Sequence, residues 1–337
     1  MPLVSVIVPA FNAERTIDRT LLSVRAQSHS NLEIIVVDDG STDETAVRVL
    51  AHARQDARVR LVRRPNGGVA AARNRGIAES SADYVAPIDA DDLWHPDKIA
   101  RQLAAIVGHE EVGLVATAYC VIDQEDLVLD DLGGRLPAKT GFIDLCRRNF
   151  IGNGSSALMR RALVERVGGY DPSLRARAGQ GCEDLKLYLL VAEQSEIAFL
   201  RDPLTAYRQG QENMSGDTTQ MLRSFDMVAA EFCARRPELR RHFNAHRVYM
   251  LCWLINGTLR SHRYVKAAGL GGHLISTPSL ALPHAIAGAV GRRLAVASQR
   301  ALRNGTDQSR ISWLAPLNGP DRSRPRNDFT RVSERDE

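Results

Sequence analysis

Two kinds of segment alternate over the first 120 residues, and this alternation constrains the fold more than any other feature of the chain. Short runs rich in Val and Ile, typical of buried strands, occur at about 3–9, 32–38, 58–62, 83–88 and 112–120. The polar segments between them have helical spacing, at about 13–27, 42–54, 69–79 and 96–107. Strand–helix–strand order with short connections predicts an α/β fold, with a mostly parallel sheet and helices on both faces.

The pattern changes twice further along the chain. From 121 to 215 it loosens around glycine-rich turns, with one more helix at about 183–194. Helical spacing then returns from 217 to 266, interrupted at Pro237. The expected division of the chain is one domain over 1–215, a basic helical extension over 216–303 and a disordered tail over 304–337.

Charge is distributed unevenly between these regions. Residues 1–230 hold 26 Lys and Arg against 32 Asp and Glu, whereas residues 231–303 hold 12 against 2. One interpretation of the basic segment is a helical extension whose arginines face water. The other is a peripheral contact with an anionic membrane surface. Nucleic acid is not an expected partner, because the arginines lie in no recognisable binding module.

Composition argues against several other classes of protein. No stretch reaches the roughly 18 uninterrupted apolar residues that a membrane-spanning helix needs. The five cysteines lie far apart with no CxxC pair, which argues against a disulfide framework or a zinc site. The first residues read as a strand and not as a signal peptide, so we expect a cytoplasmic protein. The oligomeric state is left open.

Ligands of such sheets bind at the carboxyl ends of the strands, so the residues after each strand are candidates for a site. The first two strands are followed by Pro9-Ala10-Phe11-Asn12 and by Asp38-Asp39-Gly40-Ser41-Thr42-Asp43. An acidic pair there can accept hydrogen bonds from a nucleotide base or from ribose. The alternative is a turn in which Ser41 or Thr42 caps the next helix. The binding candidates of this region are Pro9, Phe11, Asn12, Asp38 and Asp39.

Paired glycines follow the third strand, in Asn66-Gly67-Gly68, and Arg73 comes in the helix after them. A backbone without side chains can approach a phosphate closely, and Arg73 would supply a cation. The segment contains neither GxxxxGK nor GxGxxG, so it matches no standard phosphate loop. Asn66, Gly67 and Arg73 are therefore candidates for binding a substrate phosphate.

Three carboxylates follow the fourth strand within four residues, in Asp89-Ala90-Asp91-Asp92. Carboxylates this close repel one another unless a cation neutralises them. Mg²⁺ or Mn²⁺ takes few protein carboxylates and completes its coordination with diphosphate oxygens and water. The alternative is a solvated acidic turn in which Asp92 caps the helix that begins after Trp94.

A second acidic pair, Glu183-Asp184, stands where a glycine-rich loop enters a helix. The helix dipole stabilises ionised carboxylates at such a position. The pair is therefore either a functional site or an ordinary acidic helix start.

Taken together, these segments resemble the family 2 glycosyltransferases, which have the GT-A fold with its Rossmann-like sheet. The resemblance covers about residues 3–215. It rests on Val6–Asn12, Val37–Asp43, Asn66–Asn74 with Gly76, Ile88–Asp92, Val167–Asp171 and Glu183-Asp184. The order and spacing of these segments are those of the family.

The resemblance implies an inverting enzyme that moves one sugar from a nucleotide-sugar donor, with UDP-sugar favoured, to an acceptor hydroxyl. By position, Asp39 would hold the base of the donor, and Asp184 would be the catalytic base. Asp89 and Asp91 would hold the ribose and the diphosphate through Mg²⁺ or Mn²⁺. Ala90 and Glu183 complete the substrate-binding candidates. The implied acceptor is a glycan or a lipid-linked sugar in cell-envelope or exopolysaccharide synthesis, recognised in part by residues 150–182.

Two departures from the family pattern matter. The family often shows Tyr-Arg-x-His, whose His binds the metal, but this chain has Tyr207-Arg208-Gln209-Gly210 and offers no third protein ligand there. The Gln-x-x-Arg-Trp segment of processive synthases is also absent, which favours transfer of single sugars.

Three other classes of protein agree less well with the sequence. A nucleotide-sugar-binding protein without catalysis is disfavoured by the intact acids. A sugar nucleotidyltransferase would carry a basic glycine-rich loop after the first strand, where this chain has Phe11-Asn12. A dehydrogenase is disfavoured by the missing GxGxxG.

Overall fold

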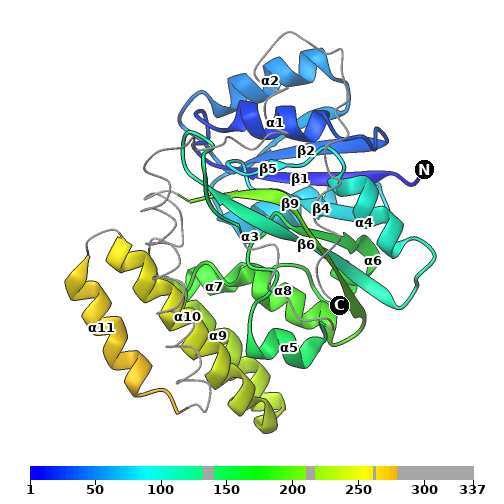
Figure 1. Cartoon of the computed structure of the whole chain (residues 1–337). Coiled ribbons are helices and arrows are strands. Elements are labelled where there is room, and N and C mark those ends of the chain that lie inside the picture. The colour runs from blue at the N-terminus through cyan, green and yellow to red at the C-terminus, as the bar shows by residue number, and fades with distance from the viewer. Residues whose placement is uncertain (132–139, 210–216, 261–262, 279–337) are drawn as a thin grey trace, which may run out of the picture.

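A mixed sheet forms the centre of the molecule, with helices against both of its faces (Figure 1). The computed structural model describes residues 1–131, 140–209, 217–260 and 263–278. Within these residues the sheet has nine strands in the order β3-β2-β1-β4-β8-β6-β9-β5, with β7 paired to β6. The strands are β1 (Val4–Ala10), β2 (Leu32–Asp38), β3 (Val59–Arg63), β4 (Tyr84–Pro87), β5 (Leu93–Trp94), β6 (Val112–Ile122), β7 (Val128–Asp131), β8 (Ala157–Arg160) and β9 (Glu196–Arg208).

The strands pair in parallel in the first half of the sheet and mostly antiparallel in the second. The pairs β1–β2, β2–β3 and β1–β4 are parallel, and β6–β9 is parallel as well. The pairs β4–β8, β6–β8, β6–β7 and β5–β9 are antiparallel. The predicted α/β fold with helices on both faces is confirmed, but the sheet is more mixed than expected. A parallel crossover needs about a dozen residues, and the connection between β6 and β7 is much shorter than that.

Side chains of alternate residues along the strands enter two separate hydrophobic cores. In β1, Val6 and Val8 belong to one core and Ile7 to the other. Burial of each such side chain contributes about 1.5–3 kcal/mol, and this alternation fixes which helix covers which face. The first core is covered by α1 (Ile17–Arg25), α2 (Thr45–Gln55) and α4 (Lys98–Ile106), and the second by α3 (Val69–Ala78), α5 (Phe142–Arg147), α6 (Arg161–Arg166), α7 (Ser173–Ala176) and α8 (Glu183–Ala192).

The chain continues into helices beside the second core. They are α9 (Thr218–Arg235), a 3-10 turn at Pro237–Leu239, α10 (Arg240–Arg260) and α11 (Tyr264–Ile275). Pro237 interrupts the helical region as predicted, and Asp217 begins it by accepting hydrogen bonds from the backbone N–H groups of Thr219 and Gln220. No helix in the described residues is long and apolar enough to cross a bilayer.

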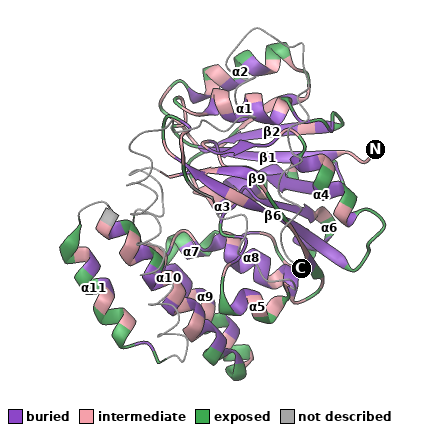
Figure 2. Ribbon diagram, viewed as in Figure 1, coloured by how far each residue is buried: buried purple, intermediate pink, exposed green. Residues whose placement is uncertain are grey.

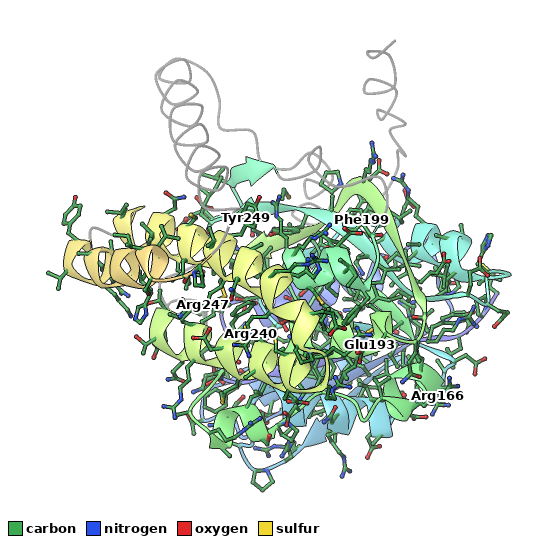
Figure 3. The ribbon with its side chains drawn as sticks, turned by 90° about the horizontal axis from the view of Figure 1, so that it is seen from below. Arg166, Glu193, Phe199, Arg240, Arg247 and Tyr249 are labelled. Carbon is green, nitrogen blue, oxygen red and sulfur yellow. The ribbon has the colours of Figure 1, made fainter. Side chains whose placement is uncertain are left out.

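These helices differ in how they attach to the rest of the molecule. Phe225 and Phe232 of α9 are buried in the second core, so α9 is part of the main body. The outermost helix, α11, rests on α10 through Leu270, which packs against Leu251 and Leu254. Figure 3 shows α10 from below, with Arg240, Arg247 and Tyr249 along it. Much of the surface of α11 is exposed, as Figure 2 shows.

Neither of the two helix caps that the sequence left as alternatives is formed. Ser41 and Thr42 bind Asn12 instead: the Asn12 N–H donates to Ser41 Oγ (3.0 Å), and the Thr42 N–H donates to Asn12 Oδ1 (2.9 Å). The first free N–H of α2 is taken by the Asp43 carboxylate, because Thr45 N donates to its Oδ1 (3.0 Å). Asp92 is buried well before α4 begins and does not cap it.

The predicted tail at 304–337 lies outside the described residues. Among the glycine-rich turns expected between 121 and 215, the stretch at 175–182 has the composition of a loop but includes the end of α7. The boundary expected at 215–216 falls at the edge of residues that the structure leaves undescribed, so the division into domains stays a prediction.

Candidate active site

The ends of β1, β2 and β4 meet at one edge of the sheet, and the polar residues that follow them lie there together. Asp39 N donates to Ala10 O (2.8 Å), which joins the turn after β2 to the end of β1. Pro9 is buried in β1, whereas the side chain of Phe11 is 52% exposed. The predicted binding candidates after the first two strands therefore share one region of the edge.

The carboxylates of Asp38 and Asp39 are both engaged by the protein. Asp39 accepts hydrogen bonds from the backbone N–H groups of Gly67 (3.0 Å to Oδ1) and Gly68 (2.7 Å to Oδ2). Asp38 is fully buried and accepts from the Ser41 N–H (2.8 Å). The acid pair thus orders the loop that opens α3, and a contact of Asp39 with a nucleotide base stays a prediction.

This loop approaches the start of α3 in a conformation that favours glycine. Gly68 has φ +87°, a backbone region that other residues adopt at a cost. Asn66 closes the loop from the other side, because its Nδ2 donates to Asp39 O (2.9 Å). A pocket lies between this loop and the segment before α8, and Gly67, Gly68, Arg175 and Glu183 are among the residues that line it.

The turn after β4 carries three acids, which the structure places in three different environments. Asp92 is fully buried; it accepts a hydrogen bond from Ser155 Oγ (2.5 Å to Oδ2) and one from the backbone N–H of Arg208 (2.8 Å to Oδ1). Burial and the nearby Asp91 and Asp89 raise its pKa well above the usual range. Asp92 is therefore an internal anchor of the turn.

Asp91 is half-buried, and no other residue that the structure describes donates a hydrogen bond to its carboxylate or forms an ion pair with it. Burial and the charge of Asp89 raise its pKa to about 6, and Arg208 offsets part of this rise. A carboxylate that is costly to ionise and has no donor from another residue is suited to a cation.

Oxygen atoms for a divalent cation are present but few. Asp91 and the Oδ2 atom of Asp89 are the available carboxylate oxygens of the turn, since Oδ1 of Asp89 is held by Arg73. Within residues 1–131, 140–209, 217–260 and 263–278, no group of three or more His, Cys, Asp or Glu has an arrangement that could hold a metal. The donor set nevertheless fits Mg²⁺ or Mn²⁺, which take one or two carboxylates and fill the other positions with water and phosphate.

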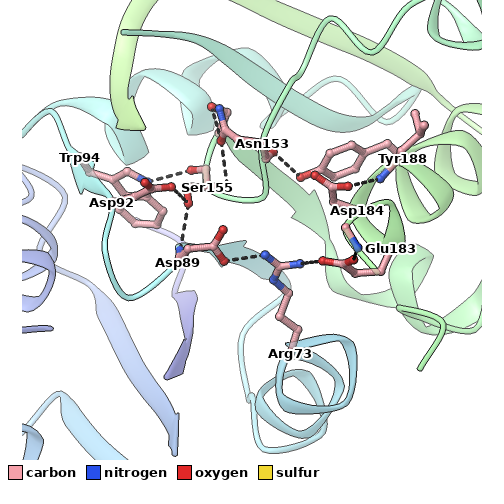
Figure 4. Close-up of polar contacts among 12 residues, drawn as sticks. Arg73, Asp89, Asp92, Trp94, Asn153, Ser155, Glu183, Asp184 and Tyr188 are labelled. Carbon is pink, nitrogen blue, oxygen red and sulfur yellow. Dashed lines mark hydrogen bonds and ion pairs between the residues drawn. The ribbon is translucent and has the colours of Figure 1, made fainter. Parts of the chain in front are cut away.

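Arg73 lies between the two acidic segments and contacts both, as Figure 4 shows. Its Nη2 donates to Asp89 Oδ1 (2.5 Å), and its Nη1 donates to Glu183 Oε1 (3.0 Å). The side chain is buried, with its guanidinium 5.1 Å from the ring centroid of Tyr170. The sequence indicated a cation for a substrate phosphate here; the structure surrounds that cation with carboxylates, and the phosphate contact stays a prediction.

The two acids at the start of α8 occupy different environments. Glu183 is buried and, besides Arg73, accepts from the backbone N–H of Gly181 (3.1 Å). Asp184 is half-buried and accepts only from the adjacent Leu185 N–H among the described residues (2.6 Å). Burial first and the charge of Glu183 second raise the pKa of Asp184 to about 7, against a smaller lowering by Arg73.

The loop before β8 supplies residues that the sequence did not single out. Ser155 accepts from the backbone N–H of Asp89 (2.9 Å), and its carbonyl accepts from Trp94 Nε1 (2.8 Å). Asn153 Oδ1 accepts from the Ser155 N–H (2.9 Å), and its carbonyl accepts from Tyr188 Oη–H (3.1 Å). The only sequence signal was the run of small polar residues at 152–156, which is also typical of an ordinary turn.

The sheet topology and the acidic edge define the class of protein: this is the fold of the GT-A glycosyltransferases. Residues 5–168 match the family described as Glycosyl transferase family 2. The chain is 31% identical over 219 residues to a Bacillus subtilis (strain 168) protein named for teichuronic acid biosynthesis, TuaG; the match covers 64% of this chain and 82% of that protein. The chain belongs to glycosyltransferase family 2.

Two further likenesses are informative. An Escherichia coli enzyme named UDP-Glc:alpha-D-GlcNAc-diphosphoundecaprenol beta-1,3-glucosyltransferase WfgD is 33% identical over 127 residues, which is 37% of this chain and 49% of that enzyme. The solved structure of the mannosyltransferase PcManGT from Pyrobaculum calidifontis, in complex with GDP-Man and Mn²⁺, has a TM-score of 0.55 and 20% identity. That likeness covers 90% of this chain and 87% of the other and supports the fold.

Proposed function

We propose that this glycosyltransferase moves a single sugar, with inversion, from a UDP-sugar to an acceptor hydroxyl in the synthesis of a cell-envelope or exported polysaccharide. The observation that carries the proposal is the separation of roles at the start of α8. Glu183 is held by Arg73, whereas Asp184 is half-buried beside it with a pKa near neutrality. A group with these properties is suited to general base catalysis near pH 7.

Asp184 accepts the proton of the acceptor hydroxyl as that oxygen attacks the anomeric carbon from the face opposite the nucleotide. Asp91 and Oδ2 of Asp89 are the residues that would hold Mg²⁺ or Mn²⁺. The metal, when bound, stabilises the negative charge that develops on the departing diphosphate. Arg73 keeps Glu183 and Asp89 at fixed positions on either side of its guanidinium.

The proposed classes of donor and acceptor are taken from the name of a relative. The Escherichia coli relative is named for UDP-Glc and for a sugar linked to diphosphoundecaprenol. We extend this chemistry to the present chain: UDP as the nucleotide, and a glycan or lipid-linked sugar as the acceptor. The Pyrobaculum neighbour holds GDP-Man, so the nucleotide is the first property to test.

A lipid-linked acceptor would be reached from the surface of a membrane, and we propose that the enzyme works at the cytoplasmic face of one. Three apolar side chains of α11 support this, since Tyr264 is 61%, Val265 90% and Ile275 82% exposed. Residues 239–278 contain no Asp or Glu and six Lys and Arg. Exposed apolar side chains in a basic segment are suited to an anionic lipid surface.

A thermal-shift panel of UDP-, GDP- and dTDP-sugars with and without Mn²⁺ tests the proposal, because a bound ligand raises the melting temperature by mass action. We expect the largest rise for a UDP-sugar with Mn²⁺. Asp91→Ala should lose the part of the rise that requires Mn²⁺, whereas Asp39→Ala should lose binding of UDP without metal. Equal losses in both variants with no effect of Mn²⁺ would contradict these assignments. A donor-hydrolysis assay separates the enzyme from a protein that only binds.

A further inference from the structure

Arg208, the last residue of β9, is buried beside the turn that carries Asp89 and Asp91, with 2% of its surface exposed. The pairing of strands brings it there. The short strand β5, which follows the turn directly, pairs antiparallel with β9 so that Leu93 faces Ala206. The residues before Leu93 therefore lie opposite the residues after Ala206.

Two groups of Arg208 bind this turn. Its side-chain Nε donates to the carbonyl oxygen of Asp91 (2.8 Å), and its backbone N–H donates to Asp92 Oδ1 (2.8 Å). The turn is thus held both through its main chain at Asp91 and through the buried carboxylate next to it. The carboxylate of Asp91 itself receives neither bond.

The rest of the guanidinium is fixed by the connection between β6 and β7. Nη2 pairs with Asp126 Oδ1 (2.5 Å), and Nη1 donates to the carbonyl oxygen of Asp123. Asp126 has φ +64° and is also paired with Arg19 of α1. All three nitrogens of the guanidinium are therefore engaged. Their contacts connect the turn to the β6–β7 connection and, through Asp126, to α1.

We propose that Arg208 is a positioning residue for the divalent cation: it fixes the main chain at Asp91 and so sets the position from which the Asp91 carboxylate would hold the cation. The inference rests on the proposed metal-dependent function. The geometry supports this role. A side chain that binds the carbonyl oxygen of Asp91 restricts the backbone of Asp91, and the carboxylate of Asp91 projects from that backbone. Lysine cannot reproduce this, since its single nitrogen cannot serve three acceptors in a planar fork.

The test is the affinity of the full-length protein for Mn²⁺ in the presence of UDP, measured by calorimetry and by the electron paramagnetic resonance of bound Mn²⁺. We expect Arg208→Lys to weaken Mn²⁺ binding about 10–100-fold, as changes to groups that orient metal ligands do. Binding of UDP without metal should stay within about twofold of the wild type, because the substitution leaves the Gly67 loop unchanged.

Arg160→Lys is the matched control. Arg160 also donates to backbone carbonyls, at Val112 (2.9 Å), Ile106 (3.1 Å) and His109 (3.0 Å), but it does so on β8 and contacts none of the three acids of the turn. A general loss of stability should therefore appear in both variants, whereas weaker Mn²⁺ binding should appear only in Arg208→Lys.

If Arg208→Lys does not fold, Asp126→Asn provides the same test, because it keeps the arginine and weakens its support; Mn²⁺ binding should then fall by several-fold. A folded variant of either kind that binds Mn²⁺ within twofold of the wild type would overturn the inference. If the wild type itself binds no Mn²⁺ with UDP, it is the metal of the proposed function that fails.

Discussion

Adjacent residues of the same chemical type acquire different properties in this site because one is paired and the other is not. Glu183 and Asp184 both stand in the first turn of α8. Arg73 pairs with Glu183, whereas burial first and the charge of Glu183 second raise the pKa of Asp184 to about 7. The surroundings of Asp184, more than its position in the sequence, therefore make it able to accept a proton near neutral pH.

Asp184→Asn should abolish transfer while leaving donor affinity within a few-fold of the wild type. Removal of a general base costs about 10²–10⁴ in rate, and the amide cannot accept the proton. Glu183→Gln should cost less activity, because it keeps the base, but it should lower the melting temperature, because buried Arg73 loses a charged partner. Steady-state kinetics and thermal melts of both variants check this. An Asp184→Asn enzyme with more than half of wild-type activity contradicts the assignment.

The pKa of Asp184 also predicts two dependences on pH. Transfer requires the ionised base, so kcat should fall as pH drops below about 7. The folded pKa lies above the ordinary value of 3.8, so the native state binds the proton more tightly than the unfolded state, and stability from this group declines as pH rises from about 4 to 7. Asp184→Asn removes this decline. Its melting temperature relative to the wild type should therefore be higher at pH 8 than at pH 4, and a constant difference argues against the raised pKa.

The sequence indicated the acids of this site better than their partners. Asp91 and Asp184 stand out because carboxylates cluster after a strand or at the start of a helix, which is a local pattern. The pairing of Arg73 with Glu183 spans 110 positions, and no local pattern shows it. Asp38 and Asp39 illustrate the same limit, since whether such a carboxylate faces a ligand or a backbone N–H depends on how the loops of other strands close over it.

At the scale of elements, α3 packs unusually close to the sheet at Gly76. A Cβ atom there would lie 2.4 Å from Cγ2 of Ile7 and 3.3 Å from Cγ2 of Val37. Both neighbours are buried branched side chains with little freedom to move. The close approach seats the C-terminal half of α3 directly against β1 and β2.

Gly76→Ala should therefore destabilise the protein by about 1–3 kcal/mol through overpacking. Gly257→Ala in α10 is the matched control, because nothing lies within 4 Å of its Cβ position. There the same substitution should stabilise by about 0.5–1 kcal/mol through helix propensity. Urea unfolding of both variants measures the difference, and similar effects of the two substitutions would show that the close packing is relieved at little cost.

The hydrophobic periodicity predicted the strands and helices of the first 120 residues well, because each one buries an apolar face in the regular spacing of its type. It did not predict the antiparallel half of the sheet. β5 is only two residues long, and its place beside β9 depends on pairing with a segment more than 100 residues later. Periodicity contains no information about such a partner.

On the scale of the whole molecule, the helix that exposes Tyr264, Val265 and Ile275, α11, lies away from α1 and α2 (Figure 1). The division into an acidic body and a basic extension was evident in the sequence. The exposure of Val265 and Ile275 was not, because an apolar residue in a helical pattern is equally typical of a buried face.

The wild type should float with anionic vesicles at low salt, stay behind with neutral vesicles and be released by high salt, because exposed apolar side chains insert while basic residues attract the lipid charge. Val265→Glu combined with Ile275→Glu should abolish flotation. Val47→Glu on α2, also at a highly exposed valine (65%), should leave it unchanged. If the wild type remains in solution with anionic vesicles at low salt, residues 231–303 serve only as a structural extension.

The bridge made by Arg73 also limits how such enzymes can be recombined. Its two partners, Asp89 and Glu183, come from segments that lie far apart in the chain and that the proposed function assigns to the donor and to the acceptor. A chimera that takes the segment around Glu183 from a relative places a different residue beside the buried guanidinium of Arg73. We expect the exchange to succeed only when the incoming segment brings an acid to the position of Glu183, because buried Arg73 otherwise loses a charged partner.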